Sequence, residues 1–338
     1  MNLLERIQFV NKLHHRIQHI VESNEPSEII GRAALYNNWF TPENVRKSLQ
    51  GILFLTEEEN VKTWLSAYQI PDFPVQKKVG LVLAGNIPLV GFHDILCVFL
   101  SGHIALIKPA TDDTFLTTKL LELMVEIEPR IINHIKLADR LNAAEAFIAT
   151  GSNNSSRYFE YYFSKFPHII RKNRNSVAVL SGNETAEDFK ALATDIFSYF
   201  GLGCRNVSKL FVPEGYDFVP FFEAIEEFGD IFLHHKYKNN YDYNKSVYLI
   251  NCEHHFDNGF LMLKEDKAYS SPISVVFYEH YKSLSALSLQ LQADEEKIQC
   301  IVSNNPEVLG AEKLGKSQLP APNDYADGVD TITFLINI

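Results

Sequence analysis

Cys204 is the residue whose type and surroundings most directly suggest chemistry. It lies in the segment Gly201-Leu202-Gly203-Cys204, where two glycines precede a thiol at the end of a run with helical character. Glycine has no Cβ, so another backbone or a ligand can approach closely and unusual φ/ψ values become accessible. A cysteine buried only for packing needs no such neighbours. The segment is therefore typical of a nucleophilic thiol at the head of a tight turn, with an ordinary Gly-Cys loop as the alternative.

Asn86 is the second candidate, in the segment Gly85-Asn86-Ile87-Pro88 that follows a short apolar run. Its side-chain amide can donate to a developing oxyanion, and a backbone N–H near Cys204 can supply a second donor. The alternative is structural, because Asn is a favoured cap before a helix that starts with Pro. Both roles are compatible only if the side chain points into the site.

Two more loops follow strand-like runs, Lys108-Pro109-Ala110-Thr111 and Thr150-Gly151-Ser152. Lys108 offers donors and a positive charge to a ribose or phosphate, unless it is simply solvated. Gly151 and Ser152 precede a predicted helix, whose first N–H groups can bind a phosphate, although many such turns are only caps. The Gly-x-Gly-x-x-Gly pattern of dinucleotide-binding folds is absent. In an open parallel sheet, ligands bind beyond the carboxyl ends of the strands, so these loops should face one crevice.

Short apolar runs alternate with helical stretches along the chain, which predicts a parallel α/β fold. The predicted strands lie at 79–84, 103–107, 146–150, 177–180 and 209–213, and the predicted helices at 88–100, 114–125, 158–166 and 187–200. The predicted domains are a helical N-terminal segment at 1–75, a cofactor-binding α/β domain at 76–198, a catalytic α/β domain with the thiol at 199–315, and a C-terminal segment at 316–338 that ends in a strand at 331–336.

The composition and charge of the chain argue against several classes of protein. The net charge of −11 argues against broad nucleic-acid binding, which needs a basic surface. The most apolar stretch, 79–107, is interrupted by polar residues and is not expected to span a membrane. The four cysteines have no Cys-x-x-Cys spacing, and no export signal is visible, so we expect a reduced, cytoplasmic protein. Adjacent histidine pairs lack a matching third ligand, so no metal is expected. Cys97, in an apolar run, is expected in the core.

The order of these motifs resembles that of the aldehyde dehydrogenase superfamily: Asn-x-Pro after a strand, Lys-Pro-Ala at the next strand end, Thr-Gly-Ser before a helix, then Gly-x-Gly-Cys. Three segments resemble its acyl-CoA reductase (LuxC-type) branch: Leu83-Ala84-Gly85-Asn86-Ile87-Pro88, Arg171-Lys172-Asn173-Arg174-Asn175-Ser176 and Asp324-Tyr325-Ala326-Asp327-Gly328-Val329-Asp330. The resemblance covers about residues 75–335. It implies an aldehyde-dehydrogenase-like fold with two parallel-sheet α/β lobes.

The resemblance also implies roles for individual residues. Cys204 would accept the acyl group and Asn86 would donate to the oxyanion, while Lys108 would contact the adenosine ribose of the cofactor. The other cofactor-binding residues would be Gly85, Thr111, Thr150, Gly151 and Ser152. The implied reaction is reduction of an acyl thioester, carried by CoA or an acyl-carrier protein, to an aldehyde. Superfamily members usually pair, which implies a homodimer or higher oligomer, and the predicted strand at 331–336 could extend a neighbour's sheet.

Two departures from the family pattern refine these expectations. Arg171 stands where hydrolytic relatives carry a Glu that activates water, and an arginine cannot act as a general base. Hydrolysis of a thioacyl enzyme should therefore be poor. Thr111 stands where NAD-selective relatives often carry a Glu that holds the ribose hydroxyls. Without that carboxylate a 2′-phosphate is not repelled, so NADP(H) is favoured over NAD(H).

Alternatives remain at this point. Cys204 could serve an acyltransferase or thioesterase without hydride transfer, or the chain could be a catalytically silent relative that binds an acyl group or a carrier protein. The aromatic segment at 158–166 could form an acyl-binding groove, although its helical spacing favours core packing. The basic cluster of Arg171, Lys172 and Arg174 could meet CoA phosphates, or it could be a solvated strand end.

Overall fold

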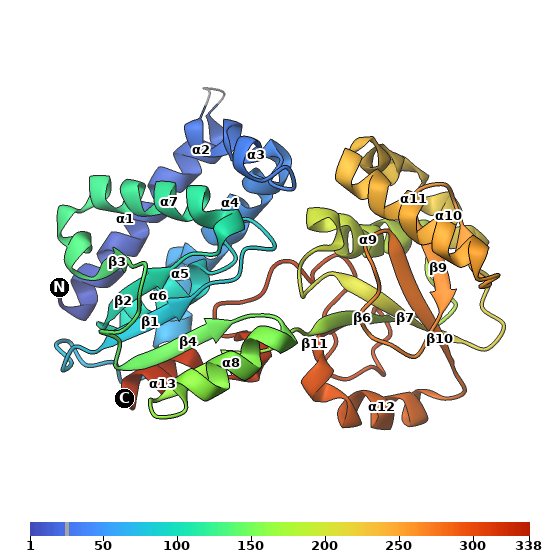
Figure 1. The fold of residues 1–338 in the computed structure, drawn as a ribbon. Helices are drawn as coiled ribbons and strands as arrows, with labels where there is room; N and C mark the ends of the chain where they lie inside the picture. Colours follow the sequence, from blue (N-terminus) through green and yellow to red (C-terminus); the bar gives the residue numbers. More distant parts are fainter. Residues whose placement is uncertain (24–26) are drawn as a thin grey trace. The chain divides into compact units, whose positions relative to one another are not determined.

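The computed structural model describes residues 1–23 and 27–338, which form two compact units (Figure 1). Unit 1 comprises Met1–Asn173 and Pro320–Ile338, and unit 2 comprises Arg174–Leu319. Unit 2 is thus inserted between two parts of unit 1 along the chain. Among the residues that the structure describes, none of the helices combines the length and the apolar character needed to cross a membrane.

Unit 1 is built on a five-stranded parallel sheet with the strand order β3-β2-β1-β4-β5. The central strand β1 is buried on both faces, because Val79 and Leu81 on one face are fully inaccessible to solvent and Gly80 on the other face is also buried. Gly80 lies between them because a Cβ there would approach the ring of Phe147 to 2.9 Å. The strands are Lys78–Val82 (β1), Ile104–Lys108 (β2), Ile135–Leu137 (β3), Ala146–Thr150 (β4) and His168–Arg171 (β5).

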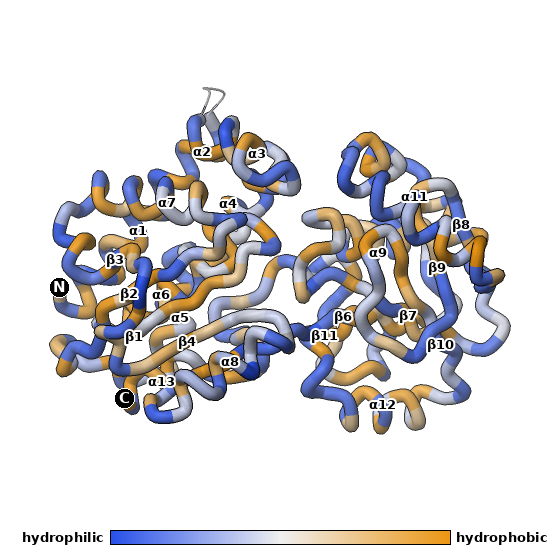
Figure 2. Tube along the Cα trace, viewed as in Figure 1, coloured by the Kyte–Doolittle hydropathy of each residue, from blue (hydrophilic) through white to orange (hydrophobic). Residues whose placement is uncertain are grey.

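Helices pack on this sheet and form the larger part of the core of unit 1. α1 begins with a capping box, in which Asn2 and Glu5 each accept a backbone N–H from the other. α6 is buried along almost its whole length, including Cys97 as predicted, and its hydrophobic stretch is visible in Figure 2. The helices are Leu3–Glu22 (α1), Glu28–Gly31 (α2), Ala33–Tyr36 (α3), Pro42–Thr56 (α4), Glu58–Leu65 (α5), Phe92–Ser101 (α6), Thr114–Ile127 (α7) and Asn153–Phe163 (α8). The predicted helical N-terminal segment is confirmed.

The C-terminal segment returns to unit 1 and ends in a helix, α13 (Thr331–Ile336), so the strand predicted at 331–336 is wrong. Asp330 caps this helix by accepting the Thr333 N–H at 2.8 Å. Ile332 and Leu335, three residues apart, are both fully buried, and α13 packs on α6. The alternation of Thr and apolar residues imitates a strand, but the cap and the spacing of three select a helix. The segment therefore offers no strand to a neighbouring sheet.

Unit 2 is built on a six-stranded sheet with the order β11-β6-β7-β10-β9-β8, parallel except for the edge strand β8. Its strands are Asn175–Val179 (β6), Val207–Pro213 (β7), Phe256–Asp257 (β8), Met262–Glu265 (β9), Val275–Tyr281 (β10) and Ile298–Val302 (β11). Its helices are Ala186–Phe197 (α9), Val219–Ala224 (α10), His235–Ile250 (α11) and Leu284–Ala293 (α12). The predicted fold class, two parallel-sheet α/β lobes with a helical N-terminal segment, is confirmed.

The boundary between the lobes differs from the predicted position at residue 198/199. The predicted boundary assigns the strand at 177–180 to the cofactor-binding domain, but the corresponding strand β6 pairs with β11 and β7 in unit 2. α9 follows β6 and packs on β7 and α10. The fold therefore divides at Asn173/Arg174 and again at Leu319/Pro320. A run of apolar residues indicates a buried strand, but it does not say which sheet the strand joins.

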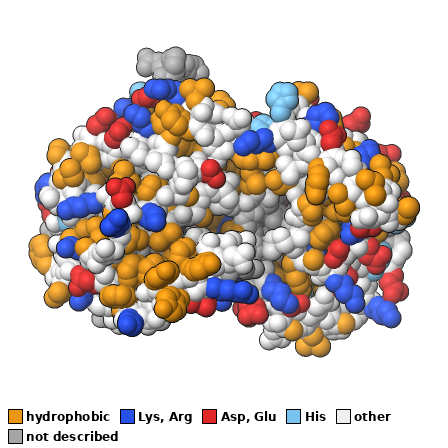
Figure 3. All heavy atoms as spheres, viewed as in Figure 1, with side chains coloured by type: hydrophobic (Ala, Val, Ile, Leu, Met, Phe, Trp, Pro, Cys, Tyr) orange, Lys and Arg blue, Asp and Glu red, His pale blue; other side chains and the backbone are white. Residues whose placement is uncertain are grey.

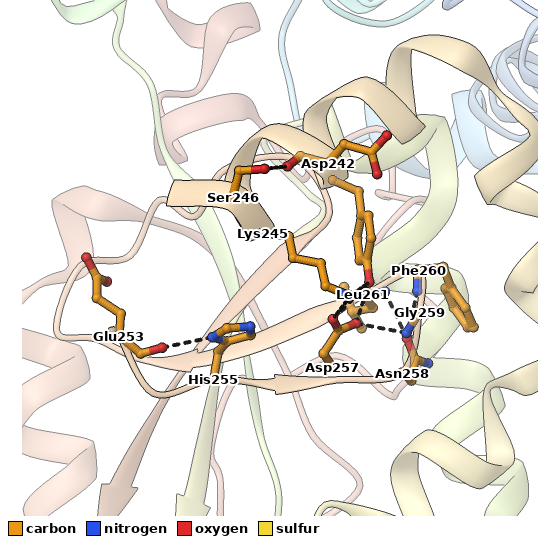
Figure 4. A network of polar contacts seen from close by, with 11 residues as sticks. Asp242, Lys245, Ser246, Glu253, His255, Asp257, Asn258, Gly259, Phe260 and Leu261 are labelled. Carbon is orange, nitrogen blue, oxygen red and sulfur yellow. Dashed lines mark hydrogen bonds and ion pairs between the residues drawn. The ribbon is translucent and has the colours of Figure 1, made fainter. Parts of the chain in front are cut away.

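The edge of the sheet in unit 2 is fixed to α11 by a network of polar contacts around Asp257 (Figure 4). The Lys245 ammonium lies 2.7 Å from the Asp257 carboxylate, and the Tyr241 hydroxyl donates to the same group at 2.7 Å. The Gly259 N–H also donates to it, at 2.8 Å. Burial alone would raise the pKa of Asp257. The Lys245, Tyr241 and Gly259 donors outweigh this effect, so the pKa of Asp257 lies below its ordinary value.

Candidate functional site

The segment that carries Cys204 has an unusual backbone conformation. After α9, Tyr199, Phe200 and Gly201 have φ values of 52°, 59° and 78°. The left-handed region is costly for non-glycine residues, so the surrounding structure must hold this conformation in place. Tyr199 is buried, and Cys204 is exposed to solvent. The predicted tight turn before an accessible thiol is therefore present.

Cys204 occupies the second position of a four-residue turn that runs from Gly203 to Asn206. The Asn206 N–H donates to the Gly203 carbonyl at 3.0 Å, and the Gly203 N–H donates to the Asn206 side-chain oxygen at 2.7 Å. The two ends of the turn are thus bonded to each other twice. This arrangement restricts the backbone on both sides of the thiol.

Contacts from other elements of unit 2 fix the same turn. The Ser176 hydroxyl on β6 donates to the Cys204 carbonyl at 3.0 Å and accepts the Cys300 N–H from β11 at 3.2 Å. Arg205 reaches the Ser317 carbonyl at 3.5 Å. The fully buried Asp195 on α9 holds the segment of Ser317 by accepting its N–H at 3.1 Å and its hydroxyl at 2.8 Å. Ser176, Asp195 and Asn206 were not singled out from the sequence, because small polar residues carry no local signal of such roles.

In unit 1 the three predicted loops lie at one edge of the sheet. Val82 at the end of β1 pairs with Lys108 on β2 and with Ala149 on β4. Because the strands are parallel, the segments that follow them leave from the same edge. The Gly85–Pro88, Lys108–Thr111 and Thr150–Ser152 loops are therefore brought together as expected.

Gly85 and Asn86 occupy the first of these loops. A Cβ at Gly85 would lie 2.6 Å from the Cβ of Ala110, so glycine is required where the first and second loops touch. Asn86 is exposed and does not cap α6, which begins at Phe92 with Gly91 in the capping position. The capping alternative for Asn86 is thus wrong.

Asp113 joins these two loops, and sequence reasoning missed it. It lies at the end of the short 3-10 turn Thr111–Asp113 and is 2% exposed. Its carboxyl accepts the N–H of Leu89 at 3.1 Å and the hydroxyl of Thr117 at 3.3 Å. Leu89 has a φ of 54°, so the bond supports a strained part of the Asn86 loop. Burial raises the pKa of Asp113 to about 8.

Asp113→Asn should alter the pH dependence of stability. A carboxyl whose pKa is raised on folding holds its proton in the folded state while the unfolded chain, with a pKa of about 3.9, loses it. The free energy of unfolding of the natural chain should therefore decrease as pH rises from about 4 to about 8, by about 1.4 kcal/mol for each pH unit at most. The variant lacks this loss, so its melting temperature relative to the natural chain should increase across that range.

The matched control is Asp112→Asn, because Asp112 is the exposed neighbour in the same turn. Thermal unfolding followed by circular dichroism at a series of pH values would compare the three proteins. If Asp113→Asn and the natural chain lose stability in parallel as the pH rises, the buried carboxyl does not titrate as argued.

The remaining predicted cofactor residues lie at the same edge. Lys108 and Thr111 are exposed, the latter at the start of the 3-10 turn. Ser152 caps α8 by accepting the Ser155 N–H at 3.2 Å, and a Cβ on Gly151 would lie 2.8 Å from the Phe159 ring. Gly151 and Ser152 thus allow α8 to begin at this point, Gly151 by leaving room for Phe159 and Ser152 by capping the helix. The N–H groups of its first turn and the Lys108 ammonium are the kind of donors that a dinucleotide phosphate and ribose require, so these residues fit a nicotinamide cofactor.

Arg171 at the end of β5 does not form part of an exposed basic cluster. It is buried, lies 2.5 Å from Asp94 on α6 and donates to the Thr331 hydroxyl at 2.8 Å. Burial disfavours the charged guanidinium, but Asp94 more than offsets this and the pKa of Arg171 is raised. Lys172 pairs with Glu160 at 2.9 Å.

Arg174 belongs to unit 2, where it donates to two backbone carbonyls, and Lys172 belongs to unit 1. Both alternatives for the cluster, a CoA-phosphate site and a solvated strand end, are therefore wrong for Arg171.

The aromatic segment on α8 is mostly exposed, so the favoured core interpretation is wrong for most of it. Tyr158, Tyr161 and Tyr162 are 66%, 78% and 66% exposed. Only the other side of the helix packs inward, with the Phe163 ring stacked on Phe147 at 4.0 Å between centroids. Figure 3 shows hydrophobic side chains gathered on the face of unit 1 over β4 and α8. Within residues 1–23 and 27–338, no group of three or more His, Cys, Asp or Glu side chains is arranged to hold a metal ion.

Comparison with known structures supports the fold. The chain aligns over 100% of its length with 84% of aldehyde dehydrogenase 21 from Physcomitrella patens, at 13% identity and a TM-score of 0.65. It also aligns with an NADP-dependent enzyme from E. coli, over 94% of this chain and 76% of that one, at 12% identity and a TM-score of 0.65. An aldehyde dehydrogenase from Bacillus cereus, solved with NAD+, aligns over 91% and 73%, at 12% identity and a TM-score of 0.63. At these identities the likeness shows the fold alone.

Comparison by sequence identifies the family. No curated protein matches the chain significantly. The family described as acyl-CoA reductase (LuxC) matches residues 8–225, which is more than half of the chain and includes Asn86, Lys108 and Cys204. With the aldehyde-dehydrogenase-like fold and an accessible cysteine on a constrained turn, this match places the chain in the LuxC acyl-CoA reductase family.

Proposed function

We propose that the chain reduces an acyl thioester to an aldehyde through an acyl group held on Cys204, with NADPH as the hydride donor. The observation that carries this proposal is the exposed Cys204 on a turn whose backbone is fixed at both ends. Membership of the acyl-CoA reductase family supports the reaction class. The acyl donor is acyl-CoA or an acyl-carrier-protein thioester.

In the first step the Cys204 thiolate attacks the carbonyl carbon of the thioester. A carbon–sulfur bond forms to Sγ, the bond to the CoA sulfur breaks, and CoA leaves as a thiol after taking up a proton. A thiolate is required because the neutral thiol is a poor nucleophile. The exposure of Cys204 allows a substrate to reach Sγ, and the fixed turn spares the cost of ordering the backbone during attack.

Asn86 is proposed as a donor to the oxyanion that develops on the carbonyl oxygen, together with a backbone N–H near Cys204. A donor that is already in place when charge develops is worth more than one that must reorient. Two features support a fixed position for the Asn86 loop. Asp113 accepts the Leu89 N–H, and Ser48 donates its hydroxyl to the Pro88 carbonyl at 2.6 Å.

The proposed cofactor residues are Gly85, Lys108, Thr111, Thr150, Gly151 and Ser152. Lys108 would bind the ribose, and the first turn of α8 would bind the phosphates. When bound, NADPH supplies a hydride to the carbonyl carbon of the Cys204 thioester, after which the carbon–sulfur bond breaks, the aldehyde leaves and the thiolate is restored. Thr111 carries no charge that would repel a 2′-phosphate, which supports NADPH over NADH.

The environment of Arg171 supports reduction over hydrolysis. The side chain at this position is committed to a buried ion pair with Asp94 and a hydrogen bond to Thr331. A permanently charged guanidinium cannot take a proton from water. A thioacyl group on Cys204 would therefore persist until hydride or another thiol reaches it.

The test is NADPH oxidation by the purified chain with a series of acyl-CoA thioesters of increasing length. We expect NADPH consumption, free CoA and aldehyde in equal amounts, and a slower reaction with NADH. Release of CoA without NADPH consumption would instead identify an acyltransferase or thioesterase. Failure of every thioester to label Cys204 would indicate a protein that only binds acyl groups or their carrier.

A further inference from the structure

One buried amide, that of Asn206, connects the end of α9 to the turn that carries Cys204. Asn206 is 3% exposed. Its side-chain oxygen accepts the Gly203 N–H at 2.7 Å. Its side-chain nitrogen donates to the carbonyls at the end of α9, those of Asp195, Ile196 and Ser198, at 2.9, 3.3 and 2.8 Å. Its backbone N–H closes the turn onto the Gly203 carbonyl.

These contacts require an amide at this position. The carbonyls at the end of a helix have no partners within the helix and need donors, while the Gly203 N–H needs an acceptor. Of side chains this short, only asparagine offers both an acceptor and an NH₂ group with two donors. Aspartate would place a carboxylate oxygen against three carbonyl oxygens, and alanine would leave buried polar groups without partners, which is costly.

The position of Asn206 explains how the strained segment between α9 and Cys204 is held. Tyr199, Phe200 and Gly201 turn the chain through the left-handed region between the two sets of hydrogen bonds. The Asn206 side chain bonds to the carbonyls at the end of α9, before these three residues, and to the Gly203 N–H, after them. It therefore links the two ends of the strained segment. Ser176 holds the Cys204 carbonyl from a separate strand. Removal of the Asn206 amide would therefore break its bond to Gly203 and keep the bond from Ser176 to the Cys204 carbonyl.

We propose that Asn206 is a positioning residue for the Cys204 nucleophile. This inference rests on the proposed function of Cys204 as the acyl-accepting thiol. Asn206 itself touches neither substrate nor cofactor in this proposal. Its effect is to hold the backbone of Cys204, and hence Sγ, in the geometry required for attack.

Asn206→Ala should lower kcat for acyl-CoA-dependent NADPH oxidation by about 100-fold, the loss expected when a reacting atom is misplaced by about 1 Å. KM for NADPH should stay close to that of the natural chain, since the proposed cofactor residues lie in unit 1. The matched control is Asn244→Ala. Asn244 on α11 is another buried asparagine of unit 2, and its amide donates to the Ile273 carbonyl at 3.0 Å. Both variants should lose stability, but only Asn206→Ala should lose kcat.

Asn206→Asp separates positioning from a general loss of stability. A protonated carboxyl can still donate to a carbonyl, whereas an ionised one is repelled by the three oxygens and also raises the pKa of a nearby thiol. The kcat of this variant relative to the natural chain should therefore rise as pH falls. The charged groups beside the turn, Asp195 and Arg205, are present in both proteins, so a difference between the two pH profiles reports the added carboxyl and its effect on these neighbours. Because an ionised carboxylate here also destabilises the protein, circular dichroism must show that the variant is folded at each pH; in the folded variant, a purely structural role would give a kcat ratio that does not change with pH.

Thiol alkylation provides a measurement that does not depend on the reductase activity. Iodoacetamide labelling followed by peptide mass spectrometry gives separate rates for Cys204 and Cys252, which is also exposed and serves as an internal reference. We expect the ratio of the Cys204 rate to the Cys252 rate to fall several-fold in Asn206→Asp at alkaline pH and to stay unchanged in Asn244→Ala. An unchanged ratio in folded Asn206 variants would overturn the positioning role, even if the natural chain proves to have no reductase activity. Absence of reductase activity in the natural chain, together with a changed ratio in the Asn206 variants, would instead contradict the proposed function and leave the positioning role standing.

Discussion

Cys204→Ala should abolish acyl-CoA-dependent NADPH oxidation, with a loss of at least about 10,000-fold, because removal of a nucleophile eliminates the covalent route. No thioacyl group can form on the alanine, so a radiolabelled acyl-CoA should no longer label the protein. The measurement is the steady-state rate, combined with mass spectrometry of the acyl adduct formed in the absence of NADPH.

The matched control is Cys252→Ala, since Cys252 is also an exposed cysteine of unit 2. It should keep its full rate and its acyl label. NADPH binding should survive in Cys204→Ala, because the proposed cofactor residues belong to unit 1. An acyl adduct that persists in Cys204→Ala, or an equal loss of rate in both variants, would remove Cys204 from the reaction.

Much of the fold could be predicted because the central strands are apolar runs between helices of ordinary length. β1, β2, β4 and β7 lie within about two residues of the predicted ranges, since burial on both faces leaves a continuous hydrophobic pattern. The prediction of a strand at the C-terminus is wrong because the alternation in Thr331–Ile336 satisfies a period of two as well as a spacing of three. The cap from Asp330 and the packing on α6 distinguish these possibilities.

The predictions for β6 and for the aromatic residues of α8 are wrong because both depend on contacts between segments that are far apart in the sequence. β6 carries the apolar pattern of any buried strand, and its assignment to the second sheet depends on pairing with β11 from far along the chain. The aromatic residues of α8 have a helical spacing that indicates a buried face, but the number of aromatic residues exceeds what one face can bury. Tyr158, Tyr161 and Tyr162 are therefore left in solvent.

The part of the site that could be predicted from the sequence follows from the order and direction of the strands more than from individual residues. Parallel strands bring their carboxyl ends to one edge, so the Lys108 and Thr150–Ser152 loops could be placed together from sequence. The residues that hold the site were not predictable in this way. Asp113 and Asn206 act through backbone groups of residues with left-handed or otherwise constrained conformations, and the sequence does not reveal which backbone groups lack partners.

Asn86→Ala should lower kcat by about 100- to 1,000-fold, which is the effect of removing one oxyanion donor. The charge on the carbonyl oxygen develops only in the transition state, so KM for acyl-CoA should change much less than kcat. Both formation of the Cys204 thioacyl group and its reduction pass through such an oxyanion, so both steps should slow. Rapid-mixing measurements of CoA release and of NADPH consumption would separate the two steps.

The matched control is Asn142→Ala, an exposed asparagine of unit 1 in the segment before β4, at the opposite edge of the sheet from Lys108. It should leave both steps unchanged. Because Asn86 is exposed, its replacement should change the melting temperature little. A large fall in melting temperature together with a normal kcat would show that Asn86 serves the loop between β1 and α6 and not the oxyanion. The developing charge would then depend on other donors, such as a backbone N–H near Cys204.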